Sequence, residues 1–369
     1  LFFAIPGDLA NRKPGEIIRQ RKVTVRALNT LPMNVDAWQL LYRTTGEDGQ
    51  PIASATTLLA QRGVRPTKIF SHQTATDSVA ADCRPSKTLL SAPPVDFTAR
   101  GGPLMLSLPS LETLISSVAL SKGWGVVIPD VGGLEAQFLL PKLHAYTTLD
   151  SIRAAEQFAP WRMSAATPVG LYGYSGGGME TSLAAEYQPG YAPELNIRGA
   201  ALGSPFRDVA GAVKAVQGAP TSGLVPMGVA ALVKQDPAHA KELMRDVSAW
   251  GRAKVRAALH QCTPQAVLEG LWIDYNRFFT APLDVVVNRP LFKKAFARLA
   301  ELEYRPTAPL YIYSAVADEI VTISSVDKLV RHYCRGDASV TYRRQELPPN
   351  PVTQLNSPHG ITMVTGLFA

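Results

Sequence analysis

A five-residue turn, Gly173-Tyr174-Ser175-Gly176-Gly177, constrains this chain more than any other feature. It lies between a short apolar segment, 169–172, and a helix-like segment that we expect to end before Pro189. In a G-x-S-x-G turn of this kind, the serine takes a strained conformation that lifts its hydroxyl above a sheet. Side chains at both flanking glycine positions would clash with the adjoining backbone. A phosphate-binding loop is excluded, because no Lys-Ser/Thr pair follows the glycines.

The surrounding pattern predicts the fold class. Short apolar strands alternate with helix-like segments, and this order is typical of a parallel sheet with helices on both faces. The clearest strands are expected at 125–130, 169–172, 197–202, 310–313 and 339–342. A hairpin, 39–42 with 52–59, precedes them. Together with the serine turn, the pattern predicts an α/β-hydrolase fold with a mostly parallel central sheet flanked by helices.

One long segment departs from this alternation. Between residues 206 and 305 the strands stop, and the sequence shows helical periodicity interrupted by prolines. We interpret this segment as an inserted helical cap. The expected organisation is a first part of the core with an N-terminal extension at 1–205, a cap at 206–305, and a second part of the core at 306–369.

The chain order of acidic and histidine residues predicts a catalytic triad. A serine hydroxyl needs a histidine to accept its proton and a carboxylate to orient that histidine, and in this fold they follow in the order serine, acid, histidine. Asp318 follows the strand at 310–313, at the carboxyl end that would face the serine turn. His359 falls in an expected loop after the last strand, next to the small Gly360. We therefore predict Ser175, Asp318 and His359 as the catalytic residues.

The competing acids and histidines are less well placed. Asp327 falls in an expected surface helix, and Glu319 would point elsewhere on a tight loop. The other histidines precede the serine, fall in the cap or lie in a helix: His72, His144, His239, His260 and His332.

The negative charge that develops on a substrate oxygen needs two preorganised N–H donors. The residue after the nucleophile, Gly176, supplies one of them. No HGGG stretch is present, so the residues by themselves place the second donor only between about His72 and Cys83.

Composition narrows the class of protein. Apolar residues make up 46% and charged residues 18% of the 369 residues, values that fit a globular protein and exclude disorder. No run approaches the ~18 consecutive apolar residues that a membrane helix needs.

The net charge is +7, but the densest basic stretch, 12–26, has no interleaved aromatic residues and is typical of a solvated strand rather than a nucleic-acid site. The three cysteines lack a C-x-x-C spacing, so we expect no zinc or redox site.

Four segments together resemble the secretory lipases of fungi and actinobacteria, of the Candida antarctica lipase A type. They are the serine turn at 173–177, the strand 125–130 followed by Gly132-Gly133, the acidic segment 318–321, and the segment 78–86. The resemblance runs from 3–6 to His359-Gly360. It implies that Asp77 supplies the second oxyanion donor from its backbone. It also implies a disulfide between Cys83 and Cys262, with Cys334 unpaired, and hence an oxidising compartment outside the cytoplasm.

These observations predict a serine carboxylic-ester hydrolase, a lipase or esterase that acts on acylglycerols or other acyl esters through an acyl-enzyme, with no metal or organic cofactor. A serine peptidase or acyltransferase is the alternative, because the same triad serves both. A non-catalytic binding module of the same fold is disfavoured, because all three triad residues are present.

We expect a small-molecule or lipid ester as the substrate. A lipid–water interface is one place where the protein would bind it. No nucleic acid and no transmembrane segment are expected, and the protein should be a monomer. It should be secreted or reside in the periplasm or cell envelope, with a signal peptide removed before Leu1.

Overall fold

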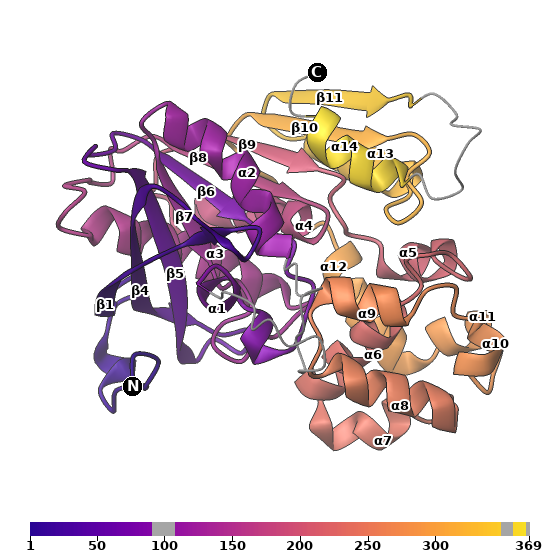
Figure 1. The fold of residues 1–369 in the computed structure, drawn as a ribbon. Coiled ribbons are helices and arrows are strands. Elements are labelled where there is room, and N and C mark those ends of the chain that lie inside the picture. The colour runs from indigo at the N-terminus through magenta and orange to yellow at the C-terminus, as the bar shows by residue number, and fades with distance from the viewer. Residues whose placement is uncertain (91–107, 348–356, 367–369) are drawn as a thin grey trace.

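The computed structural model describes residues 1–90, 108–347 and 357–366. These residues form one large central sheet of nine strands, flanked by helices (Figure 1). In spatial order the strands are β1 (Ile17–Val23), β4 (Val35–Thr45), β5 (Pro51–Gln61), β7 (Gly125–Pro129), β6 (Ile69–Gln73), β8 (Val169–Tyr174), β9 (Ile197–Gly203), β10 (Leu310–Ala315) and β11 (Val340–Gln345). A separate small ribbon pairs β2 (Arg26–Ala27) with β3 (Leu31–Pro32).

The sheet is mostly parallel, as predicted. The six strands from β7 to β11 in this order run parallel, whereas β1, β4 and β5 pair antiparallel with their neighbours. The expected hairpin is the β4–β5 pair. All five residues of β7 are buried, because layers of side chains cover both faces of the sheet there. Val126 and Ile128 pack in one apolar cluster, and Val127 packs in another on the opposite face.

Helices cover both faces of the sheet, which confirms the predicted fold class. Outside the cap they are α1 (Pro85–Thr88), α2 (Leu108–Ser121), α3 (Pro141–Gln157), α4 (Gly176–Tyr191), α13 (Ile323–Tyr333) and α14 (Pro358–Thr365), with short 3₁₀ turns at Leu9–Asn11 and Ala81–Cys83. Helices α3, α4 and α13 share one apolar core with the sheet. Helix α2 contributes Ala119 and Leu120 to the cluster on the other face. No helix among the described residues is long and apolar enough to cross a membrane.

Every element between β9 and β10 is a helix, and we call this group the cap. It contains α5 (Val209–Ala215), α6 (Leu224–Gln235), a 3₁₀ turn (Pro237–His239), α7 (Ala240–Leu243), α8 (Ala249–Ala258), α9 (Thr263–Glu269), α10 (Tyr275–Phe278), α11 (Leu283–Val287) and α12 (Pro290–Ala300). In Figure 1 these salmon and orange helices gather beside the sheet, away from β1 and β4. The cap has its own apolar core, which Met179 and Leu183 of α4 complete.

Two local predictions were wrong. Helix α4 does not end before Pro189 but continues to Tyr191. A proline in the last turn removes only one backbone hydrogen bond, and the Ala192 N–H still donates to Gln188 O at 2.9 Å. His359 lies in the first turn of α14 rather than in a loop.

Candidate active site

The turn around Ser175 has the strained geometry that the sequence predicts. Ser175 joins β8 to α4 with φ of 57° and ψ of −118°. A Cβ atom at residue 173 would lie 2.0 Å from the Gly177 carbonyl oxygen, and one at residue 177 would lie 2.0 Å from the Gln73 carbonyl oxygen. The expected close approach of strand and helix is therefore confirmed, and only glycine fits at both positions.

The structure brings Asp318 and His359 into direct contact. His359 Nδ1 lies 2.8 Å from Asp318 Oδ2, and the two residues are 7% and 8% exposed, respectively. The same Oδ2 accepts a hydrogen bond from the Ser204 hydroxyl at 2.9 Å. The other oxygen, Oδ1, accepts from the backbone N–H groups of Ile320 at 3.0 Å and Val321 at 2.7 Å.

These contacts determine the charge of Asp318. Burial by itself would raise the pKa of the carboxyl group. The hydrogen bond and the charge of His359, together with the two backbone N–H donors, outweigh burial and hold the pKa of Asp318 below its usual value. Asp318 is therefore an ionised acceptor in a fixed orientation, which suits a group that holds a histidine ring.

Two further residues hold the backbone of His359. The Tyr174 hydroxyl donates to the His359 carbonyl oxygen, and the two rings lie with their centroids 5.0 Å apart. The Glu319 Oε2 atom accepts from the His359 N–H at 3.0 Å, and the Ser357 hydroxyl donates to the other carboxylate oxygen of Glu319. Glu319 thus binds the main chain of His359, while its neighbour Asp318 binds the imidazole.

Ser175 is placed near His359 through its neighbour in the chain rather than through a recorded contact of its own. Tyr174, whose ring packs against His359, directly precedes Ser175. Among the described residues, however, no hydrogen bond joins the Ser175 hydroxyl to the His359 ring. Catalytic hydrogen bonds of this kind are often long before a substrate binds and shorten in the complex.

The two predicted oxyanion residues touch each other. Gly176 is the first residue of α4, so its N–H has no acceptor within the helix and lies at the positive end of the helix dipole. Asp77 follows β6 with φ of 45°, a conformation that aspartate and asparagine tolerate better than most residues. A Cβ atom at residue 176 would lie 1.8 Å from Asp77 Oδ1, so the Asp77 carboxyl packs directly against Gly176.

The Asp77 carboxyl has unusual electrostatics. Its Oδ1 atom is buried and has no hydrogen-bond partner among the described residues. Burial, followed by the charge of Glu112, raises the pKa of Asp77 to about 7, and the charge of His359 only partly opposes this. The Asp77 side chain is therefore neutral in mildly acidic solution and becomes charged near neutral pH.

Ser175, Gly176 and Asp77 line the same pocket. Most of the other lining residues are apolar and come from the cap, among them Val225, Met227, Val229, Leu232, Phe279 and Phe292. Such a lining excludes water and favours an extended apolar group. In the part of the chain that the structure describes, no group of three or more His, Cys, Asp or Glu side chains could hold a metal ion.

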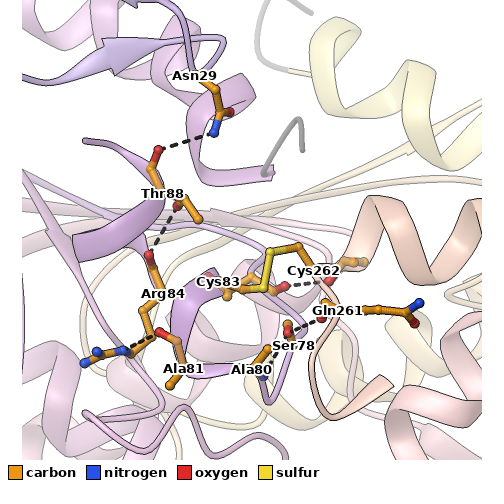
Figure 2. Close-up of a disulfide and its surroundings, with 11 residues drawn as sticks. Asn29, Ser78, Ala80, Ala81, Cys83, Arg84, Thr88, Gln261 and Cys262 are labelled. Atoms are coloured by element: carbon orange, nitrogen blue, oxygen red, sulfur yellow. Dashed lines mark hydrogen bonds between the residues drawn. A yellow bond between two sulfur atoms is a disulfide. The ribbon is translucent and has the colours of Figure 1, made fainter. Parts of the chain in front are cut away.

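A disulfide links the cap to the segment that follows Asp77. Figure 2 shows the bond between Cys83 and Cys262, and beside it the hydrogen bond from the Ser78 hydroxyl to the Gln261 carbonyl oxygen at 2.7 Å. Cys334 is an exposed free thiol.

The sequence analysis missed Glu112, a residue that holds the backbone next to Asp77. Glu112 of α2 accepts a hydrogen bond from the Ala75 N–H, just before Asp77, at 3.0 Å. The other oxygen of Glu112 lies 3.0 Å from His72 Nε2. No local pattern marks Glu112, because its partners lie about 40 residues away in the chain.

Known proteins match this chain over most of its length. The family described as secretory lipase matches residues 101–366. A protein of Mycobacterium tuberculosis described as a probable inactive lipase is 33% identical over all of this chain and 81% of its own length. Lipase A of Arthroderma benhamiae is 31% identical over 99% of this chain and 76% of its own length.

The fold has a close counterpart among solved structures. The X-ray structure of Candida antarctica lipase A superposes with a TM-score of 0.79 at 26% sequence identity, covering 94% of this chain and 80% of that one. This match agrees with the α/β-hydrolase fold that the sequence predicted. From the family match and the two relatives above 30% identity, this protein belongs to the secretory lipase family, a family of lipases and esterases.

Proposed function

We propose that this protein hydrolyses carboxylic esters of apolar acids, with Ser175 as nucleophile, His359 as general base and Asp318 as the acid that orients His359. The observation that carries the proposal is the buried Asp318–His359 hydrogen bond of 2.8 Å beside the strained turn of Ser175. Membership of a family of lipases and esterases agrees with this chemistry.

The geometry suggests the following sequence of steps. The Ser175 hydroxyl attacks the ester carbonyl carbon while His359 Nε2 accepts its proton, and Asp318 stabilises the imidazolium that forms. The N–H groups of Gly176 and Asp77 bind the oxygen that becomes negative. His359 then returns the proton to the leaving alcohol, which leaves an acyl group on Ser175. Water releases the acid by the same steps in the second half of the reaction.

The pocket supports an apolar acyl group as the part of the substrate that is recognised. Its lining comes mainly from apolar side chains of the cap, among them Val225, Met227 and Phe292. We therefore favour acylglycerols or other acyl esters, reached from solution or from a lipid–water interface. The segment 206–305 acts in this proposal as a cap over the site, between core parts 1–205 and 306–369.

The same features favour action outside the cytoplasm. A disulfide such as Cys83–Cys262 persists in oxidising compartments, and the family is described as secretory. We propose a secreted or cell-envelope protein that works as a monomer.

The test combines two measurements on the intact protein. The protein should hydrolyse p-nitrophenyl butyrate and decanoate, and a fluorophosphonate should add to Ser175, as located by mass spectrometry of its peptides. Cleavage of peptide substrates with no ester hydrolysis would favour the peptidase alternative. If the protein neither hydrolyses these esters nor reacts with the fluorophosphonate, the binding-module alternative is favoured. That outcome would agree with the description of the M. tuberculosis relative as a probable inactive lipase.

Filling the pocket at Gly228 should shorten the acyl chain that the enzyme accepts. Gly228 lies on α6 and lines the pocket, and a Cβ atom there would have no neighbour within 4 Å. Gly228→Phe should lower kcat/KM on the decanoate ester by about 10-fold or more, with the butyrate ester within about threefold. Gly228→Ala, which adds one methyl group, is the matched control. Equal losses on both esters would contradict this assignment of the pocket.

The charge of Asp77 should limit activity in alkaline solution. Because the pKa of Asp77 is raised to about 7, the carboxyl is neutral below this pH and ionised above it. A carboxylate against Gly176 would repel the developing oxyanion, so kcat/KM should fall by up to about 10-fold per pH unit above pH 7. Asp77→Asn is uncharged and tolerates the positive φ, so it should keep its activity between pH 7 and 9.

Two groups on other elements act on the pKa of Asp77, Glu112 of α2 and His359 of α14, and Asp77 in turn helps to raise the pKa of Glu180 of α4. Their positions are the same in the asparagine variant, so the two pH profiles isolate the charge of residue 77. Identical alkaline limbs in the two proteins would show that another group causes the loss.

A further inference from the structure

The segment that carries Asp77 is fastened to the cap on both sides of that residue. In chain order, the links are Thr263 Oγ1 to Thr76 O at 2.6 Å, Ser78 Oγ to Gln261 O at 2.7 Å, Lys234 Nζ to Val79 O at 2.7 Å, and the Cys83–Cys262 disulfide. Two of the links flank Asp77 directly. The cap therefore lines the pocket and also holds the loop that carries a proposed oxyanion donor.

The Thr263 hydrogen bond holds the Thr76–Asp77 peptide group, whose N–H is the proposed oxyanion donor. The Thr76 carbonyl and the Asp77 N–H belong to the same peptide group, which is planar, so fixing the direction of one fixes the direction of the other. A hydrogen bond to the Thr76 oxygen also polarises the group and strengthens its N–H as a donor. Thr263 is only 5% exposed, so water has little access to replace its hydroxyl.

The conformation of Asp77 explains why such a support is needed. Its φ of 45° is sparsely populated by residues other than glycine, and it persists only where the surroundings determine it. On the core side, Glu112 fixes the Ala75 N–H at 3.0 Å. On the cap side, the Thr76 carbonyl is held by Thr263. Without the second contact, the Thr76 carbonyl loses this support, and the Thr76–Asp77 peptide has more freedom to turn its N–H away from the substrate.

We propose that Thr263 of the cap is a positioning residue for the oxyanion hole, which orients the Thr76–Asp77 peptide so that the Asp77 N–H faces the developing oxyanion. This inference rests on the proposed function, because it concerns the same site. It assigns the cap a role in the rate of the chemical step, in addition to its contacts with the acyl group.

The test compares variants that remove or keep the hydroxyl. Thr263→Val has nearly the same shape but no hydroxyl, and it should lower kcat on p-nitrophenyl butyrate by about 10- to 100-fold with KM within about threefold. Thr263→Ser restores the hydroxyl and should return kcat to within about threefold of the wild type. An alkylboronic acid forms a tetrahedral adduct that resembles the transition state, so its inhibition constant should rise in Thr263→Val in parallel with the loss of kcat/KM.

Ser222→Ala provides the matched control in the cap. The Ser222 hydroxyl is also buried, but it binds only within the cap, to the Gly270 carbonyl oxygen at 2.9 Å and the Ile273 N–H at 2.7 Å. It should lose thermal stability without the rise in the boronate inhibition constant. If valine prevents folding at residue 263, Thr263→Ala gives the same comparison with a smaller side chain.

The outcomes separate this inference from the proposed function. An unchanged kcat and boronate inhibition constant in Thr263→Val, or no recovery in Thr263→Ser, would overturn the role of Thr263 while wild-type hydrolysis and labelling of Ser175 still stand. A wild type that neither hydrolyses esters nor reacts with a fluorophosphonate would instead overturn the proposed function, and this inference with it.

Discussion

Replacing Ser175 with alanine should lower kcat on p-nitrophenyl butyrate by about 10⁴-fold or more, with the fold intact. The variant has no hydroxyl with which to form an acyl-enzyme, so only the oxyanion donors and substrate binding would contribute to the remaining rate. The fold should survive because the Ser175 side chain makes no hydrogen bond among the described residues, and the strained backbone of the turn is held by hydrogen bonds of the main chain. Initial rates with circular dichroism on the same samples provide the measurement.

A second serine gives the control for this substitution. Ser324 is exposed on α13, so Ser324→Ala should have the activity of the wild type and still react with a fluorophosphonate. Ser175→Ala should not react at all. Activity in Ser175→Ala above about a hundredth of the wild-type value would mean that another group forms the covalent intermediate.

Local patterns in the sequence predicted the strands, the turn and the helix that position Ser175. The apolar run of β7 and the strand, turn and helix around Ser175 are contiguous in the chain, so their local residue order suffices to predict them. The steric need for glycine at 173 and 177 follows from the same local geometry. The start of α14 could also be predicted, because Ser357 followed by Pro358 is a typical helix start. The prediction of a loop at His359 overlooked this signal.

The supports of the site depend on contacts that no local pattern contains. Ser204 reaches Asp318 across 114 residues of chain, and Glu112 reaches Ala75 across 37. Such pairs form only when the sheet order and the packing of α2 place them together. The pKa of Asp77 likewise depends on burial and on the charge of Glu112, which are properties of the folded chain.

Asp318→Asn should lower kcat by about 10⁴-fold, because the backbone N–H donors around residue 318 would force His359 into a tautomer that cannot accept the Ser175 proton. Two backbone N–H groups, of Ile320 and Val321, point at Oδ1, so the oxygen of an asparagine amide must take that position. The amide nitrogen then takes the position of Oδ2 and donates to His359 Nδ1. This moves the ring proton to Nε2, where His359 is unable to accept the proton of Ser175.

Asp327→Asn is the control for this change, because Asp327 was the rival acid in the sequence. Asp327 lies on α13 and accepts a hydrogen bond from the Tyr342 hydroxyl at 2.8 Å, so its substitution should keep kcat within about threefold of the wild type. Rates on p-nitrophenyl butyrate from pH 5 to 9 would measure both variants. If Asp318→Asn keeps most of the activity while Asp327→Asn loses it, the assignment of the triad acid is wrong, and the Asp318–His359 contact serves only the packing of α14 on the sheet.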